Sequence, residues 1–139
     1  MEAPAGPERP PIQFVPADQL LAHEQVVQPR VEELVRVLQR EQVVRLAIVA
    51  DAKTLVVLDG HHRLEALRRL KCKRVPALLV DYQRPDIRVG TWRDGETAPT
   101  KDEVLRRAEQ GKLYAPKSTR HFFPWKLQEQ PVPLSDLQR

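Results

Sequence analysis

A small α/β domain is the fold class that this sequence predicts. Two apolar runs, residues 54–58 and 75–82, have the composition of buried strands. Between them the leucines repeat at helical spacing, at Leu64, Leu67 and Leu70. The length of 139 residues fits one domain and leaves little room for a second. Strands that alternate with helices in one short chain predict an α/β architecture.

The first part of the chain predicts a leader, a strand and a helix. Residues 1–11 are rich in proline and offer nothing large to bury, so we expect a disordered leader. Residues 12–15 predict a short strand that ends at Pro16. Pro29 suits the first turn of a helix, where a missing N–H costs little. The apolar face of that helix consists of Val31, Leu34, Val35 and Leu38.

The central part of the chain predicts three strands and one helix. Residues 46–50 and 54–58 are two strands joined by a polar turn. The helix follows from about His62 to Leu70, and residues 75–82 form the third strand. Pro76 indicates that this last strand either starts there or lies at an edge of the sheet.

The C-terminal part predicts a long loop and one more helix. Residues 83–100 are polar and interrupted by proline and glycine, so we expect a loop with at most a short strand. A helix over residues 101–110 is predicted by its capping residues. Thr100 and Glu103 have the spacing of a capping box, and Gly111 is placed to end the helix.

These elements predict one domain over residues 12–123, followed by a proline-containing tail over residues 124–139. The net charge of +4 arises from 23 basic and 19 acidic residues mixed along the chain, which suits a small anionic ligand better than a dedicated DNA-binding surface. The single cysteine, Cys72, excludes an internal disulfide, and we expect it to be buried. No run reaches transmembrane length and no signal-peptide core precedes Ile12, so a cytoplasmic location is expected.

The junction between the strand at 54–58 and the next helix carries the strongest functional signal. Gly60 allows the backbone to turn sharply and lets a ligand approach it. The first turn of a helix has free amide N–H groups and the positive end of the helix dipole, so it suits a phosphate or a carboxylate. His61, His62 and Arg63 add side-chain donors at this place. The pattern predicts a phosphate-binding turn.

Plainer interpretations of this junction exist. Asp59 has the chemistry of an ordinary turn residue before glycine. His61, His62 and Arg63 could form a solvated helix start, although cations are poorly placed at the positive end of a helix dipole unless an anion is present. Asp59 and the two histidines also invite a zinc interpretation, but adjacent histidines diverge and no partner set has ligand spacing.

Residues 59–63, with the sequence Asp-Gly-His-His-Arg, resemble the phosphate-binding turn of the ParB/sulfiredoxin superfamily, most closely that of its free L-serine kinases. Two more segments match in the same order, His23-Glu24 and residues 116–121. The similarity runs from about Ile12 to His121 and implies a small single-domain ParB/sulfiredoxin-like fold. Sulfiredoxins have a cysteine where this chain has His61, so repair of cysteine sulfinic acid is not expected.

The resemblance implies a kinase that transfers a phosphoryl group from ADP or ATP, with Mg²⁺, to the hydroxyl of free L-serine. It implies that Glu24 is the catalytic base, although a lone loop glutamate is by default a solvated surface charge. Asp59 would orient the substrate or the metal, and residues 60–63 would bind the donor phosphates. The segment expected to bind the phosphoamino acid or the serine carboxylate contains Lys117, Ser118, Thr119, Arg120 and His121.

A second interpretation is a non-catalytic ParB-like nucleotide-binding or regulatory module that acts through DNA or protein partners. ParB proteins place a helix-turn-helix after this domain, whereas only one clear helix follows here. We therefore expect small-molecule substrates, with no specific nucleic acid and no membrane as partners. Trp92 and Trp125 are expected to be packing anchors rather than platforms for base stacking.

Overall fold

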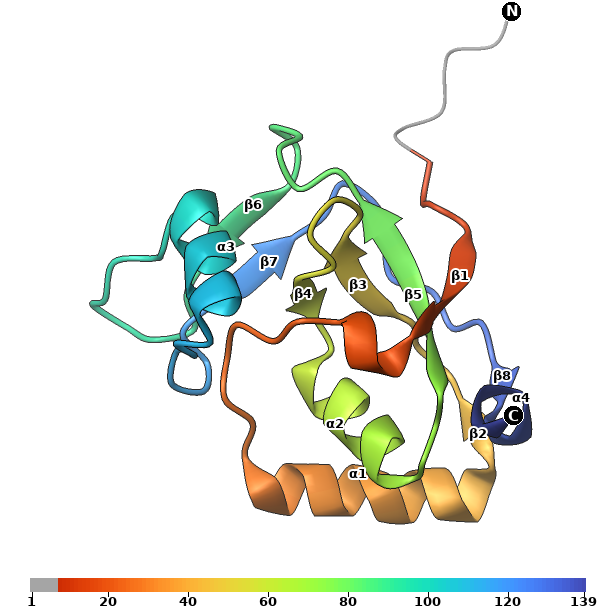
Figure 1. Cartoon of the computed structure of the whole chain (residues 1–139). Helices are drawn as coiled ribbons and strands as arrows, with labels where there is room; N and C mark the ends of the chain where they lie inside the picture. The colour runs from red at the N-terminus through yellow and green to blue at the C-terminus, as the bar shows by residue number, and fades with distance from the viewer. Residues whose placement is uncertain (1–7) are drawn as a thin grey trace, which may run out of the picture.

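A four-stranded sheet lies at the centre of the protein (Figure 1). The computed structural model describes residues 8–139. The strands are arranged in the order β1 (Ile12–Pro16), β5 (Arg74–Val80), β3 (Ile48–Asp51) and β4 (Val57–Asp59). β3 runs parallel to β5, and the other two neighbouring pairs are antiparallel. The predicted α/β class is confirmed.

One face of the sheet is covered by α1 (Gln28–Glu41) and α2 (His61–Arg69), which lie against each other below the strands in Figure 1. The predicted apolar face of α1 is confirmed, with Val31 and Leu38 buried in the core. α2 connects the antiparallel hairpin β3–β4 to β5, so its first turn begins directly at the end of β4. This connection places the sharp turn at the edge of the sheet.

The opposite face of the sheet is covered by α3 (Lys101–Gln110), which buries Val104 and Ala108 in a second core. The predicted caps of α3 are both present. The Thr100 side chain accepts a hydrogen bond from the Glu103 N–H at 3.1 Å, and Gly111 ends the helix with a φ of 70°. The strand predicted at residues 54–58 is only partly confirmed, because Thr54 lies in an exposed turn and β4 begins at Val57. Within β4, Val57 belongs to one core and Leu58 to the other.

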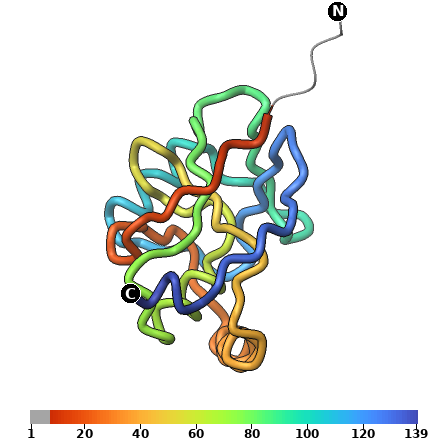
Figure 2. The backbone as a smooth tube through the Cα atoms, turned by 90° about the vertical axis from the view of Figure 1, so that its right-hand side faces the viewer, coloured from red at the N-terminus to blue at the C-terminus, as the bar shows by residue number. Residues whose placement is uncertain are grey.

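The segment predicted as a tail, residues 124–139, ends in a short strand β8 (Val132–Pro133) and a helix α4 (Leu134–Gln138). β8 pairs with β2 (Val43–Val44), and Leu134 and Leu137 are buried in the same core as α1 and α2. Figure 2 shows the C-terminal end of the chain running along the side of the molecule. The ordered structure therefore extends past residue 123. The predicted leader lies mainly outside the described residues.

The sequence did not predict every strand correctly. Pro76 lies near the start of β5, as expected, but the alternative placement at an edge is wrong because β5 is an inner strand. The pairing with β3 begins at Ala77, so Pro76 lies just before the part of β5 that has neighbours on both sides. The long loop contains the predicted short strand, β6 (Arg88–Gly90), which pairs with an unpredicted strand, β7 (Arg120–Phe122).

The remaining regular element is a 3-10 turn, η1 (Ala17–Gln19), directly after β1. Cys72 is buried, as predicted, and burial raises the pKa of its thiol. Over residues 8–139, no helix combines the length and the apolar character needed to cross a membrane.

Candidate active site

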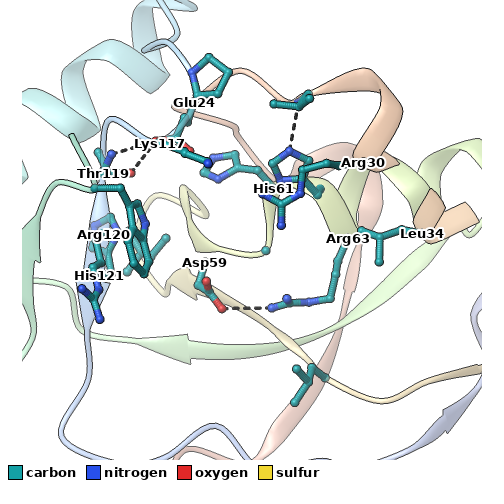
Figure 3. A pocket seen from close by; sticks show the side chains of 17 residues that line it. Glu24, Arg30, Leu34, Asp59, His61, Arg63, Lys117, Thr119, Arg120 and His121 are labelled. Carbon is teal, nitrogen blue, oxygen red and sulfur yellow. Dashed lines mark hydrogen bonds and ion pairs between the residues drawn. The ribbon is translucent and has the colours of Figure 1, made fainter. Parts of the chain in front are cut away.

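A cavity of about 900 Å³ opens where the β4–α2 turn meets the loop before α1 and the segment around β7 (Figure 3). All of the predicted site residues line it except one. The exception is Ser118, whose hydroxyl donates a hydrogen bond to the Ala115 carbonyl at 2.6 Å, within its own loop. Three segments that are far apart in the sequence, 23–24, 59–63 and 116–121, are thus brought to one place.

Gly60 forms the sharp turn at the base of the cavity. Its φ of 107° lies in the left-handed region, which favours glycine. A Cβ atom at this position would come within 2.9 Å of Arg63 Nη2 and 3.1 Å of Ile48 Cγ1. The first helical hydrogen bond runs from the Leu64 N–H to the Gly60 carbonyl at 2.9 Å. The amides at the start of α2 therefore remain available for an anion, as predicted.

The two histidines of the motif hold the loop that carries Glu24. The backbone N–H of His23 donates to His61 Nε2 at 3.1 Å. In the same way, the backbone N–H of Val27, at the start of α1, donates to His62 Nε2 at 3.0 Å. Both Nε2 atoms are acceptors here, so neither donates to a phosphate. These two rings therefore fix the backbone of the loop that carries Glu24.

Three of the four histidines of the chain line this cavity, and the fourth, His23, packs behind it against His61 and Thr119. Each of the four has a pKa below the ordinary value. Burial lowers the pKa of His23 to about 4 and that of His121 to about 3. Burial, aided by neighbouring histidines, also holds the pKa of His61 well below 6.5. The rings are therefore neutral at neutral pH. The two motif histidines therefore add no positive charge at the start of α2, and the electrostatic argument for an anion there depends on Arg63.

Arg63 and Asp59 form an ion pair at the edge of the turn, with 3.1 Å between Arg63 Nη2 and Asp59 Oδ2 (Figure 3). The same Nη2 donates to the Ala47 carbonyl at 3.1 Å. These two contacts fix the guanidinium beside the start of α2. The cavity is lined by four cationic side chains and two carboxylates, which are Arg30, Arg63, Lys117, Arg120, Glu24 and Asp59. An excess of cations suits a ligand with several negative charges.

Glu24 is half-buried and held by one residue of the opposite segment. Its Oε1 atom accepts hydrogen bonds from the Thr119 N–H at 2.9 Å and the Thr119 hydroxyl at 3.0 Å. Backbone hydrogen bonds with Tyr114 on both sides of Glu24 fix the loop further. The alternative of a freely solvated surface glutamate is therefore wrong. A carboxylate held by one oxygen can present the other oxygen to a substrate.

The last predicted segment is divided between buried and exposed side chains. His121 contacts the Tyr82 hydroxyl at 2.7 Å through Nε2 and is largely enclosed, while Lys117 and Arg120 are exposed. The Arg120 guanidinium lies 4.0 Å from the centre of the Trp92 ring. Trp92 is 55% exposed and lines the cavity, so the prediction of a packing anchor is wrong for this tryptophan. Trp125 stacks on Phe123 against the core, as expected.

One cavity residue, Arg30, carries no signal in the sequence. Arg30 follows Pro29 on the first turn of α1 and resembles any exposed helix cation. The motif match at residues 23–24 did draw attention to His23, but nothing in the sequence indicates that this ring is fully buried. Both features depend on contacts between distant segments.

Replacing Arg63 by alanine is expected to weaken nucleotide binding by about tenfold to a hundredfold, the loss for a charge-assisted hydrogen bond of about 1.5 to 3 kcal/mol. Calorimetry with ADP or ATP measures the effect. Arg106→Ala, which removes an exposed cation on α3, is the matched control and should leave affinity unchanged. Equal affinities for the Arg63→Ala variant and the unmodified chain would remove the phosphate-binding assignment.

The carboxylates and histidines of the site do not form a preformed metal centre. Over the part of the chain that the structure describes, no group of three or more histidine, cysteine, aspartate or glutamate side chains is arranged to hold a metal ion. Mg²⁺ commonly binds through one or two protein carboxylates together with substrate phosphates. Asp59, which is partly exposed at the cavity, fits that mode of binding.

Comparison with known proteins connects this geometry to one group of enzymes. No protein-family model matches the chain. An ATP-dependent L-serine kinase of Desulfurococcus mucosus is 30% identical over 101 residues, which cover 68% of this chain and 40% of the relative. An ADP-dependent L-serine kinase of Thermococcus kodakarensis is 29% identical over 102 residues, or 70% and 42% of the two chains. The chain thus spans less than half the length of these curated relatives.

A solved structure of a free serine kinase variant in complex with AMP superposes with a TM-score of 0.86. The match covers 94% of this chain and 95% of the solved chain, at 18% sequence identity. At this level of identity the superposition shows the fold. The chain therefore has the fold of the free serine kinase, as the sequence resemblance implied, and its sequence is similar to those of curated L-serine kinases.

Proposed function

We propose that this chain is a kinase that transfers a phosphoryl group from a nucleotide to the hydroxyl of free L-serine. One observation carries the proposal: the Glu24 carboxylate lies in the same cavity as the start of α2 and four cationic side chains. Phosphoryl transfer requires mainly positioning and charge stabilisation, with a group that accepts the hydroxyl proton. The similarity to named L-serine kinases supports the choice of serine as acceptor.

On the donor side, the amides at the start of α2 and the Arg63 guanidinium would hold the donor phosphates. Asp59 positions Arg63 through their ion pair, and it is also the carboxylate best placed to contact Mg²⁺ together with those phosphates. When bound, Mg²⁺ would supply charge neutralisation on the phosphate oxygens. Arg30, on the first turn of α1, adds a cation from a second helix.

On the acceptor side, Glu24 would accept the proton of the serine hydroxyl as the phosphoryl group arrives. Lys117 and Arg120 are exposed cations that line the cavity on the side of Glu24 and β7, where they suit the carboxylate of serine (Figure 3). Thr119 would act by holding Glu24. Ser118 has no part in this assignment because its hydroxyl is turned to its own loop.

Incubation of the purified chain with Mg²⁺, L-serine and either ADP or ATP tests the proposal. Phosphorus NMR should show O-phospho-L-serine together with AMP if ADP is the donor, or with ADP if ATP is the donor. Omission of serine is the control for nucleotide hydrolysis. If neither nucleotide yields phosphoserine while calorimetry still detects nucleotide binding, the chain is a nucleotide-binding module and the kinase proposal is wrong.

Duplex DNA is expected to bind only weakly and without sequence preference. The net charge is +4 and the acidic and basic residues are mixed, so any attraction is to the phosphate backbone. The affinity of the protein for DNA should fall steeply as the salt concentration rises, because counterion release drives such binding. Fluorescence anisotropy with two unrelated duplexes at low and physiological salt measures this. Sequence-selective binding at physiological salt would favour the ParB-like alternative over the kinase.

A further inference from the structure

The Thr119 hydroxyl has two hydrogen-bond acceptors and only one hydrogen to donate. Its Oγ1 atom lies 3.0 Å from Glu24 Oε1 and 2.8 Å from His23 Nε2. His23 and Glu24 are neighbours in one segment and Thr119 belongs to another, and both Thr119 and His23 are buried. One of the two acceptors must therefore be without this hydrogen whenever both are unprotonated.

The state of the His23 ring follows from its other nitrogen. Nδ1 lies 2.7 Å from the Val57 carbonyl, and because a carbonyl can only accept, Nδ1 carries the ring hydrogen. Burial lowers the pKa of His23 to about 4, so at neutral pH Nε2 has no hydrogen. Nε2 is then an acceptor that faces Thr119. The aromatic neighbours of the ring are His61, Tyr114 and His121, with ring centres 4.5, 6.5 and 5.7 Å away.

The charge of Glu24 decides which acceptor receives the hydrogen. An ionised carboxylate is a stronger acceptor than a neutral imidazole, so the hydroxyl turns to Oε1 while Glu24 is ionised. His23 Nε2 is then a buried acceptor without a donor, which is unfavourable. When Glu24 is neutral, Oε1 is a weaker acceptor and the hydroxyl can turn to Nε2. Every hydrogen bond of the cluster can then be made, because the Thr119 N–H still donates to Oε1.

We propose that Thr119 is a positioning residue that holds the ionised Glu24 carboxylate, and that His23 is a positioning residue that favours proton uptake by Glu24, because it offers the Thr119 hydroxyl a second acceptor once Glu24 is neutral. This inference rests on the proposed kinase function. The serine O–H bond breaks, and its proton forms a covalent bond with Glu24 Oε2. This oxygen has no hydrogen-bond partner among the described residues. The serine oxygen bonds to the phosphorus, whose bond to the leaving nucleotide breaks. Thr119 keeps its own hydrogen throughout.

A nitrogen NMR measurement on the His23 ring tests the rotation without any need for turnover. Glu24→Gln imitates the neutral form of Glu24, so in this variant Nε2 should show the shift of a nitrogen that accepts a hydrogen bond. In the unmodified chain at neutral pH, Nε2 should show the shift of an acceptor without a donor. On a Thr119→Val background, Glu24→Gln should no longer change the shift. Identical His23 Nε2 shifts in the unmodified chain and the Glu24→Gln variant would overturn the proposal.

A kinetic comparison tests the consequence for catalysis. Thr119→Val should lower kcat by about tenfold to a hundredfold, the range expected for the loss of a hydrogen bond to a charged group, while the KM for nucleotide stays the same. Thr119→Ser keeps the hydroxyl and should restore most of kcat. If Thr119→Ser is as impaired as Thr119→Val, the hydroxyl has no such role. Absence of turnover in the unmodified chain would instead contradict the kinase function, and the NMR result would still decide the rotation.

Discussion

The Glu24→Gln variant is expected to bind nucleotide normally and to lose turnover by about a hundredfold to ten-thousandfold, the contribution of a general base. Glutamine has the size of glutamate and can still accept the hydrogen bond from the Thr119 N–H, so the loop should keep its shape. It cannot accept the proton of the serine hydroxyl. Steady-state kinetics for kcat, together with calorimetry for nucleotide affinity, separate the loss of chemistry from a loss of binding.

The matched control for this experiment is Glu33→Gln on α1. Glu33 is exposed and does not line the cavity, so its neutralisation removes the same charge from the chain without touching the site. This control should retain full turnover. If Glu24→Gln keeps more than about a third of the unmodified kcat, the loss is too small for general-base catalysis and the role of Glu24 is wrong.

The free energy of unfolding is expected to fall by several kcal/mol when the pH is lowered from 7 to 5. The folded-state pKa values of His23 and His121 are about 4 and about 3, whereas an unfolded histidine titrates near 6.5. Below pH 6.5 the unfolded chain therefore binds protons that the folded chain does not, and stability decreases as the pH falls. Each pKa unit corresponds to about 1.4 kcal/mol, so each such histidine contributes about 2 kcal/mol between pH 6.5 and 5.

Urea denaturation at a series of pH values measures this loss. The chain has four histidines and each has a lowered pKa in the folded state, so no other histidine can cause the slope. Between pH 7 and 8 the histidines remain neutral in both states, and their contribution should be constant. A free energy of unfolding that changes by less than about 1 kcal/mol between pH 7 and 5 would show that the buried rings take up protons as easily as free ones.

The elements that the sequence predicted well are those specified by local chemistry. α3 is fixed by Thr100 and Gly111 at its two ends, and both residues act within their own turns. The β4–α2 turn is likewise specified by Gly60, whose φ and close neighbours exclude a side chain. Such features need no knowledge of the rest of the molecule, so they can be predicted from a single sequence.

The features that were missed depend on contacts between distant segments. β7 has only three residues and forms because it pairs with β6, from which it is separated in the sequence by α3. Trp92 was expected to be a packing anchor, but it is exposed and its partner is the Arg120 side chain at the cavity. The hydrogen bonds that Thr119 makes with His23 and Glu24 span 96 and 95 residues. No periodicity or spacing in the sequence encodes contacts of this kind.

A crystal structure of the chain with AMP and O-phospho-L-serine, the products expected from ADP and serine, tests most directly whether one cavity holds both donor and acceptor. We expect the nucleotide phosphate at the amides of His61 and His62 beside Arg63. We expect the seryl oxygen of the phosphoamino acid within hydrogen-bond distance of Glu24 Oε2. A nucleotide bound away from the start of α2, or a seryl oxygen out of reach of Glu24, would contradict the account.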